Sequence, residues 1–124
     1  MTKTLLIADD AAIMREIIKD TARANGWTVV AEACNGQQAV DYYAEHKPDV
    51  VTMDLVMPEY DGLHGVRGIL KADPKARVLV VSAIDQKDVL KEAFRAGATD
   101  FIVKPFDRRG LLDALETLVA SAQA

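Results

Sequence analysis

Hydrophobic residues follow two alternating patterns along the chain: short apolar runs, and longer stretches with helical spacing. The apolar runs predict strands of a parallel sheet, because strands covered on both faces have no polar side to alternate with. The longer stretches place apolar residues three or four positions apart, the spacing of one buried helix face. The predicted strands cover residues 4–8, 27–33, 50–53, 77–81 and 99–103. The predicted helices cover residues 11–25, 36–46, 63–73, 86–97 and 108–119.

Residues that commonly cap helices stand at the ends of these stretches. Asp10, Asn35, Asp85 and Asp107 precede four of the helices, and each offers an oxygen to a free backbone N–H group. Gly26 suits the left-handed turn that often closes a helix, and Gly97 ends the fourth helix. Strict alternation of strands and helices with short connections predicts a five-stranded parallel sheet with helices on both faces. We expect one α/β domain over residues 1–124, with no further output domain.

Composition narrows the classes of protein. The chain has 124 residues, half of them hydrophobic, which suits one domain with a substantial core. A net charge of −4 and the lack of a Lys/Arg-rich block argue against a nucleic-acid surface. A single cysteine, Cys34, excludes an internal disulfide, and no apolar run approaches membrane-spanning length. We therefore expect a cytoplasmic protein without membrane insertion, and a monomer.

Polar residues stand where four of the predicted strands end. Asp9 and Asp10 follow the first strand, Asp54 the third, Ser82 the fourth and Lys104 the fifth. Carboxyl ends of parallel strands share one edge of a sheet, where open α/β proteins bind their ligands. We expect three carboxylates, one hydroxyl and one ammonium group to meet there.

Such a cluster favours a metal ion and a phosphoryl group. Three carboxylates repel one another unless a cation joins them, and oxygen ligands without His or Cys favour Mg²⁺, with Mn²⁺ as the alternative. Lys104 and the Ser82 hydroxyl would serve the remaining phosphoryl oxygens. Asp54 would then be the nucleophile. Singly, Asp10 is explained as a helix cap and Lys104 as a surface charge, but their shared position favours one common site.

The motifs resemble those of the receiver domains of bacterial two-component response regulators, especially the single-domain receivers of chemotaxis. The resemblance covers essentially the whole chain. The matching motifs are Asp9-Asp10, Asp54 with Met57-Pro58 and Asp61-Gly62, Ser82-Ala83, Ala96-Gly97-Ala98 and Lys104-Pro105-Phe106. The resemblance implies a flavodoxin-like fold with strand order 2-1-3-4-5.

The resemblance also implies roles for the polar residues. Asp54 would accept a phosphoryl group from a sensor histidine kinase of the CheA type, or from acetyl phosphate. Asp10, Asp54 and the Val56 carbonyl would bind Mg²⁺, and Asp9 would hold the ion through water. Lys104 would pair with a phosphoryl oxygen. The protein would be a signalling switch that catalyses only its own phosphorylation and dephosphorylation.

The switch implied by the resemblance involves Ser82 and Phe101. The hydroxyl of Ser82 would move toward the phosphoryl group, and Phe101 would turn inward, altering the face formed by the fourth helix, fifth strand and fifth helix. A target such as the flagellar motor switch would dock there. Phe101 stands where tyrosine is frequent, so the switch would act through packing alone; the alternative is that Phe101 is a core residue. The Lys104–Pro105 bond is expected to be cis.

The lifetime of the phosphoryl group is a further expectation. Val56 and Ile84 are apolar and should flank the phosphoryl group, where neither can orient an attacking water. We therefore predict slow self-dephosphorylation. A separate phosphatase would then be a further partner.

Three other functions would use a similar pocket, a similar nucleophile or the same topology. A phosphorelay intermediate would use the same pocket and pass its phosphoryl group to a histidine phosphotransfer protein. An aspartate-nucleophile phosphatase would need an Asp-x-Asp motif, which Asp54-Leu55-Val56 lacks. A flavin-binding module would need a hydroxyl- and glycine-rich loop after the first strand, where Asp9 and Asp10 would repel a phosphate.

Overall fold

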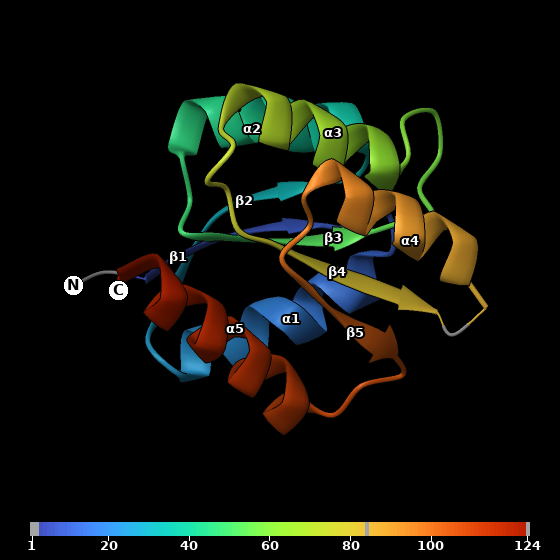
Figure 1. Cartoon of the computed structure of the whole chain (residues 1–124). Coiled ribbons are helices and arrows are strands. Elements are labelled where there is room, and N and C mark those ends of the chain that lie inside the picture. The colour runs from blue at the N-terminus through green and yellow to red at the C-terminus, as the bar shows by residue number, and fades with distance from the viewer. Residues whose placement is uncertain (1–2, 84, 124) are drawn as a thin grey trace.

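The structure is a computed structural model that describes residues 3–83 and 85–123, and its five strands alternate with five helices (Figure 1). The strands are β1 (Lys3–Ala8), β2 (Trp27–Ala33), β3 (Val50–Asp54), β4 (Val78–Ala83) and β5 (Asp100–Lys104). The helices are α1 (Ala12–Ala24), α2 (Gly36–His46), α3 (Gly62–Ala72), α4 (Lys87–Ala96) and α5 (Arg108–Gln123). The predicted order of elements is confirmed, and β3 runs one residue further than predicted, so that it includes Asp54.

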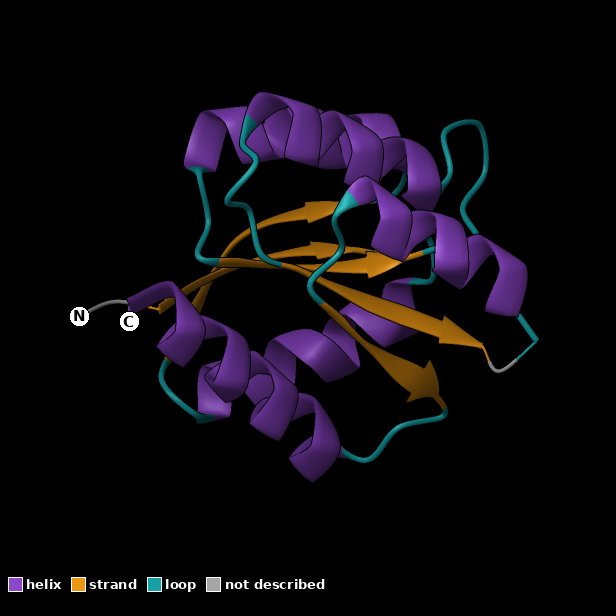
Figure 2. Cartoon of the chain, in the orientation of Figure 1, coloured by secondary structure: helices purple, strands orange, loops and turns teal. Residues whose placement is uncertain are grey.

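All strands are parallel and lie in the order β2-β1-β3-β4-β5, as the resemblance implies. Helices α2, α3 and α4 cover one face of the sheet, and α1 and α5 cover the other (Figures 1 and 2). This three-layer arrangement confirms the predicted α/β class. Each face has its own apolar core, which explains why the strands read as nearly continuous hydrophobic runs.

Strand β3 lies at the centre of the sheet and is buried along its whole length. Val51 and Met53 enter the core under α2, α3 and α4, whereas Val50 enters the core shared with α1 and α5. Because β1 and β4 flank this strand on its two sides, their carboxyl ends lie beside Asp54. A central strand that is buried along its whole length therefore carries Asp54.

Two predicted helix caps are confirmed and two are wrong. The side chain of Asn35 accepts from the Gln38 amide at 2.9 Å, and that of Asp107 accepts from the Gly110 amide at 2.6 Å. Asp10 and Asp85 do not cap their helices. The structure gives Ala11 and Gln86 as the N-cap residues of α1 and α4, neither with a side-chain cap bond.

Local turns explain both errors. The Asp9 carboxylate accepts from the Ala11 amide at 2.9 Å, so a tight turn at Asp9 delays the start of α1 and leaves Asp10 outside the helix. The Gln86 amide donates to the carbonyl of Ala83 at 3.1 Å, which likewise delays α4. Asp10 is therefore exposed at the edge of the sheet where the strands end. Within the described residues, no helix is both long and apolar enough to cross a membrane.

Candidate functional site

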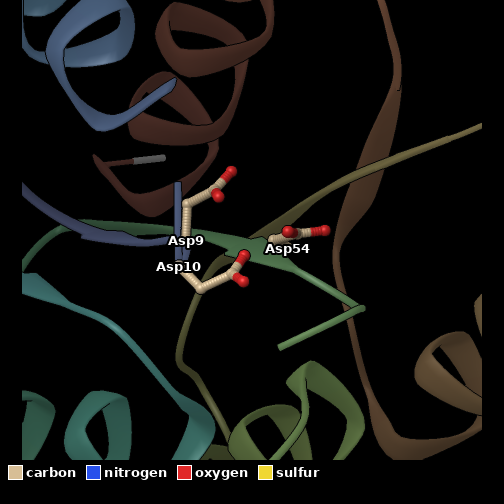
Figure 3. A group of neighbouring side chains, drawn as sticks. All are labelled: Asp9, Asp10 and Asp54. Carbon is tan, nitrogen blue, oxygen red and sulfur yellow. The ribbon is translucent and has the colours of Figure 1, made fainter. Parts of the chain in front are cut away.

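The carboxyl ends of β1 and β3 bring three acidic side chains together. Figure 3 shows Asp9, Asp10 and Asp54 pointing into a shared space at this edge of the sheet. One carboxylate oxygen of each residue lies within 4.8 Å of those of the other two. Lys104, at the end of β5, reaches the same cluster from the other side. The structure thus brings together four of the five side chains that were predicted to meet at this edge, Ser82 being the fifth.

Asp9 is the most enclosed member of the cluster, with only 2% of the residue exposed. One of its carboxylate oxygens accepts from the Ala11 amide at 2.9 Å, and the other accepts from Lys104 Nζ, also at 2.9 Å. Its own amide donates to the carbonyl of Ala33 at 3.0 Å. Both carboxylate oxygens are thus engaged, which suits an indirect hold on a metal ion better than direct ligation.

Asp54 combines burial with an accessible carboxylate. Its Oδ1 accepts weakly from the Val56 amide at 3.3 Å, and its Oδ2 lies 3.3 Å from Lys104 Nζ. Burial raises the pKa of Asp54, and the negative charge of Asp9 raises it further, while Lys104 opposes both effects. The lysine alone does not balance the negative charge around Asp54.

Lys104 forms a bridge between Asp9 and Asp54. Burial alone lowers the pKa of Lys104, but the hydrogen bond to Asp9 and the charges of Asp54 and Asp9 outweigh it and raise that pKa. Its ammonium group therefore stays charged in this partly buried place. The peptide bond from Lys104 to Pro105 is cis, as expected.

Ser82 and Val56 lie on the segments next to Asp54: Ser82 follows Val81, which pairs with Asp54, and the Val56 amide donates to Asp54 Oδ1. Ser82 is 2% exposed and lies beside Val103 in the pairing of β4 with β5, one residue before Lys104 on the neighbouring strand. Val56 is 58% exposed on the loop after β3. Ile84, the other apolar residue expected near a phosphoryl group, lies outside the described residues.

Gly62 is a site residue whose physical role the motif comparison did not reveal. A Cβ atom at this position would lie 2.0 Å from the carbonyl oxygen of Asp54. The Gly62 amide donates to the carbonyl of Leu55 at 3.1 Å, which folds the loop back against β3. Asp61, just before it, caps α3 by accepting from the His64 amide at 2.9 Å. In the sequence, the Asp61-Gly62 pair after the strand was the signal that the loop folds back at this point.

Phe101 lies on β5, next to Phe94 of α4, with 39% of the residue exposed. Its ring meets that of Phe94 edge to face, with 5.8 Å between centroids. The alternative that Phe101 is an ordinary core residue is therefore wrong. A cavity of about 150 Å³ lies beside it; its lining residues are Ser82, Ala83, Gln86, Lys87, Leu90, Phe101 and Val103.

The donor set fits a hard divalent cation. All candidate ligands are oxygens, and three carboxylates against one ammonium leave two negative charges uncompensated. A divalent cation would neutralise them. The exposed Asp10 carboxylate and the Asp54 carboxylate, whose two contacts are longer at 3.3 Å, have more room for direct ligation than Asp9, whose oxygens each accept at 2.9 Å.

Comparison with known proteins agrees with this geometry. The family model described as response regulator receiver domain matches residues 5–116. The chain belongs to this family. The receiver is 50% identical over 115 residues to the chemotaxis protein CheY of Bacillus subtilis, with 93% of this chain and 96% of that protein covered. It is 49% identical to CheY of Thermotoga maritima, with the same shares covered.

Solved structures of other receivers have the same fold. The response regulator domain of Thermotoga maritima CheB superposes with a TM-score of 0.88 at 33% identity, covering 97% of this chain and 98% of that one. A complex of CheX, CheY, BeF₃ and Mg²⁺ from Borrelia burgdorferi also gives a TM-score of 0.88, at 31% identity, covering 94% of this chain and 88% of that one. The receiver is thus closely related to CheY, and such receivers work as signalling switches.

Proposed function

We propose that this receiver accepts a phosphoryl group on Asp54 from the phosphohistidine of a sensor histidine kinase, with Mg²⁺ bound, and then binds a regulated protein. The observation that carries the proposal is the cluster of Asp9, Asp10 and Asp54 within 4.8 Å, bridged by Lys104. Phosphoryl transfer relies mainly on positioning and on charge stabilisation, and this cluster offers both.

The transfer step uses the carboxylate of Asp54. One carboxylate oxygen attacks phosphorus, the P–N bond to the donor imidazole breaks, and the imidazole leaves with that electron pair and takes up a proton. The product is an acyl phosphate on Asp54. Lys104, 3.3 Å from Asp54 Oδ2, then pairs with a phosphoryl oxygen while keeping its 2.9 Å bond to Asp9. Ser82 donates its hydroxyl to another oxygen.

Residues at the edge of the sheet would hold the metal. Asp10, Asp54 and the Val56 carbonyl would bind Mg²⁺ directly, and Asp9 would bind it through water. When bound, Mg²⁺ supplies positive charge that offsets the carboxylates and the developing charge on the phosphoryl oxygens. Mn²⁺ would serve as a substitute, because it accepts the same oxygen ligands.

The signal would pass to the surface through Ser82 and Phe101. Movement of the Ser82 hydroxyl toward the phosphoryl group opens space next to a cavity that already borders Phe101. Phe101 then leaves its edge-to-face contact with Phe94 and turns inward. This changes the face made by α4, β5 and α5, where the target docks.

The relatives favour a chemotaxis target. Near-complete coverage of two CheY proteins at about half identity supports a CheA-type kinase as donor and the flagellar motor switch as target. The CheX–CheY complex of Borrelia burgdorferi supports a phosphatase as a further partner. A phosphorelay intermediate would use the same pocket. Binding of a motor-switch peptide only after phosphorylation supports chemotaxis, whereas transfer to a histidine phosphotransfer domain supports a relay.

The proposal is tested by transfer from a purified, ³²P-labelled CheA-type kinase. The wild-type receiver should take the label within seconds to minutes in Mg²⁺, while an Asp54→Asn variant and a sample with EDTA should take none. Label on the Asn variant, or equal labelling with EDTA, would contradict the assigned acceptor or the metal requirement. Acid- and base-stability of the label then distinguish an acyl phosphate from a phosphohistidine.

A further inference from the structure

Arg15, on the fourth residue of α1, contacts the backbone of the acidic turn. Its Nη1 donates to the carbonyl oxygen of Asp9 at 2.8 Å, and its Nε lies 3.3 Å from Glu32 Oε1 on β2. Only 17% of the Arg15 side chain is exposed. A cation this close to a helix N-terminus opposes the helix dipole, so helix stability does not explain the placement.

The carbonyl that Arg15 holds belongs to the peptide group between Asp9 and Asp10. Asp9 is fixed by its own side-chain bonds, but none of the described residues donates a hydrogen bond to the exposed Asp10 carboxylate. The direction of Asp10 therefore depends on the plane of this peptide group. Arg15 holds the carbonyl of this group, while the bond from the Ala11 amide to the Asp9 side chain closes the turn that follows it.

Strand β2 is shaped to hold Arg15. The pairing of β1 with β2 shifts by one residue, from Leu5 opposite Val29 to Leu6 opposite Ala31. Before the shift, Trp27 and Val29 face the core of α1 and α5; after it, Ala33 faces the opposite core. Such an extra residue reverses the side on which later residues project. It turns Glu32 toward α1, where it meets Arg15 and, at 3.2 Å, Lys19.

We propose that Arg15, oriented by Glu32, is a positioning residue for the metal site: it holds the Asp9–Asp10 peptide group so that the Asp10 carboxylate is directed at the bound Mg²⁺. The inference rests on the proposed function, since it concerns the same metal. Side chains that orient metal ligands typically contribute 10- to 100-fold in affinity, so we expect Arg15→Gln to weaken Mg²⁺ binding about tenfold.

The sign of the effect separates positioning from simple charge. Arg15 is a cation near a cation site, so its charge alone opposes Mg²⁺, and removing that charge would tighten binding. Positioning predicts the opposite. Lys19→Gln is the matched control: it also removes one positive charge and one contact with Glu32, but Lys19 has no contact with Asp9. Its Mg²⁺ affinity should stay within about twofold of wild type, because screening weakens a more distant charge.

The experiment is a Mg²⁺ titration of ¹⁵N-labelled protein, followed through the amide resonances of Asp9 and Asp10. Arg15→Gln should bind about tenfold more weakly and show a shifted, broadened Asp10 amide before metal is added; Lys19→Gln should show neither. Arg15→Lys keeps the charge but loses the forked geometry, so it should also bind more weakly than wild type. It replaces the Gln variant if that one does not fold.

Three results would overturn the inference. Mg²⁺ affinity equal to or tighter than wild type in Arg15→Gln would show that Arg15 acts only as a charge. Wild-type affinity in Arg15→Lys would show that the forked geometry is unnecessary. Absence of Mg²⁺ binding by wild type would remove the proposed metal itself, and the inference with it; this outcome is distinct, because it appears before any variant is compared.

Discussion

Asp54 should lower the stability of the metal-free protein, so that Asp54→Asn raises its free energy of unfolding. The oxygens of Asp9 and Asp10 lie within 4.8 Å of an oxygen of Asp54. At an effective dielectric constant of about 20, each ionised neighbour repels Asp54 by about 3.5 kcal/mol. The attraction between Lys104 and Asp54, at 3.3 Å, offsets about 5 kcal/mol of this repulsion. Two repulsions of about 3.5 kcal/mol against this attraction leave about 2 kcal/mol of net repulsion. Water around the exposed Asp10 weakens its share, and the burial of Asp54 adds a cost of its own.

Removing this charge should therefore stabilise the fold by about 2 kcal/mol in EDTA at neutral pH. For a chain of this length that corresponds to a rise of about 8 °C in the unfolding temperature. Thermal unfolding followed by circular dichroism measures it. With Mg²⁺ at about 100 times its Kd, wild type gains about 2.7 kcal/mol, and the variant, which lacks a ligand charge, gains less. The advantage of the variant should then disappear.

The pH dependence supplies a second test of the same reasoning. Burial and the charge of Asp9 raise the pKa of Asp54, so the folded state binds its proton more tightly than the unfolded state does. The penalty is fully present above the folded pKa and fades as pH falls through it. The difference between variant and wild type should therefore shrink toward acidic pH. A variant less stable than wild type in EDTA, or a difference that does not change with pH, would refute this electrostatic account.

Four further substitutions test other parts of the structure. Thr52→Val should leave stability unchanged or raise it by about 1 kcal/mol in urea unfolding, because the Thr52 hydroxyl is buried without a hydrogen-bond partner. Gly62→Ala should lower the free energy of unfolding by about 3 kcal/mol, because its Cβ would meet the Asp54 carbonyl; a neutral effect would show that the loop has room. Val56→Asn should speed loss of the phosphoryl group on the order of tenfold, a barrier change of about 1.4 kcal/mol, by orienting water; an unchanged decay rate would contradict the lifetime hypothesis. Phe101→Ala should leave phosphorylation intact but weaken phosphorylation-dependent target binding in a peptide titration, and equal affinity would exclude Phe101 from the switch.

The sheet and its polar edge could be predicted from the sequence, because burial on both faces leaves a pattern of apolar residues in each strand. Strands covered on both faces must be apolar throughout, so the run that ends at Asp54 identified a buried strand without knowledge of its neighbours. The parallel direction of the strands then brought Asp9 and Lys104 to the same edge, where the structure has them 2.9 Å apart. The order of the strands came from family resemblance, because local patterns do not specify which strands pair.

The parts that sequence reasoning missed depend on contacts between distant residues. Asp9 and Asp10 are adjacent acids, and only the fold decides that Asp9 takes the turn amide and Asp10 stays free. The Arg15–Glu32 contact depends on the shifted register of β1 and β2, and the apolar pattern of β2 does not predict that shift. Phe101 is apolar but lies on an edge strand that α4 covers only in part, so its hydrophobicity did not determine its burial.

The most direct test of the central claim is the intact mass of the protein after incubation with acetyl phosphate and Mg²⁺. This donor needs no partner, so the result reports only the chemistry of the cluster. Wild type should gain one phosphoryl group, and the gain should be absent in Asp54→Asn and in wild type treated with EDTA. A gain that survives in the Asn variant, or no gain in wild type across a full titration of Mg²⁺ and donor, would contradict Asp54 as a metal-dependent phosphoryl acceptor.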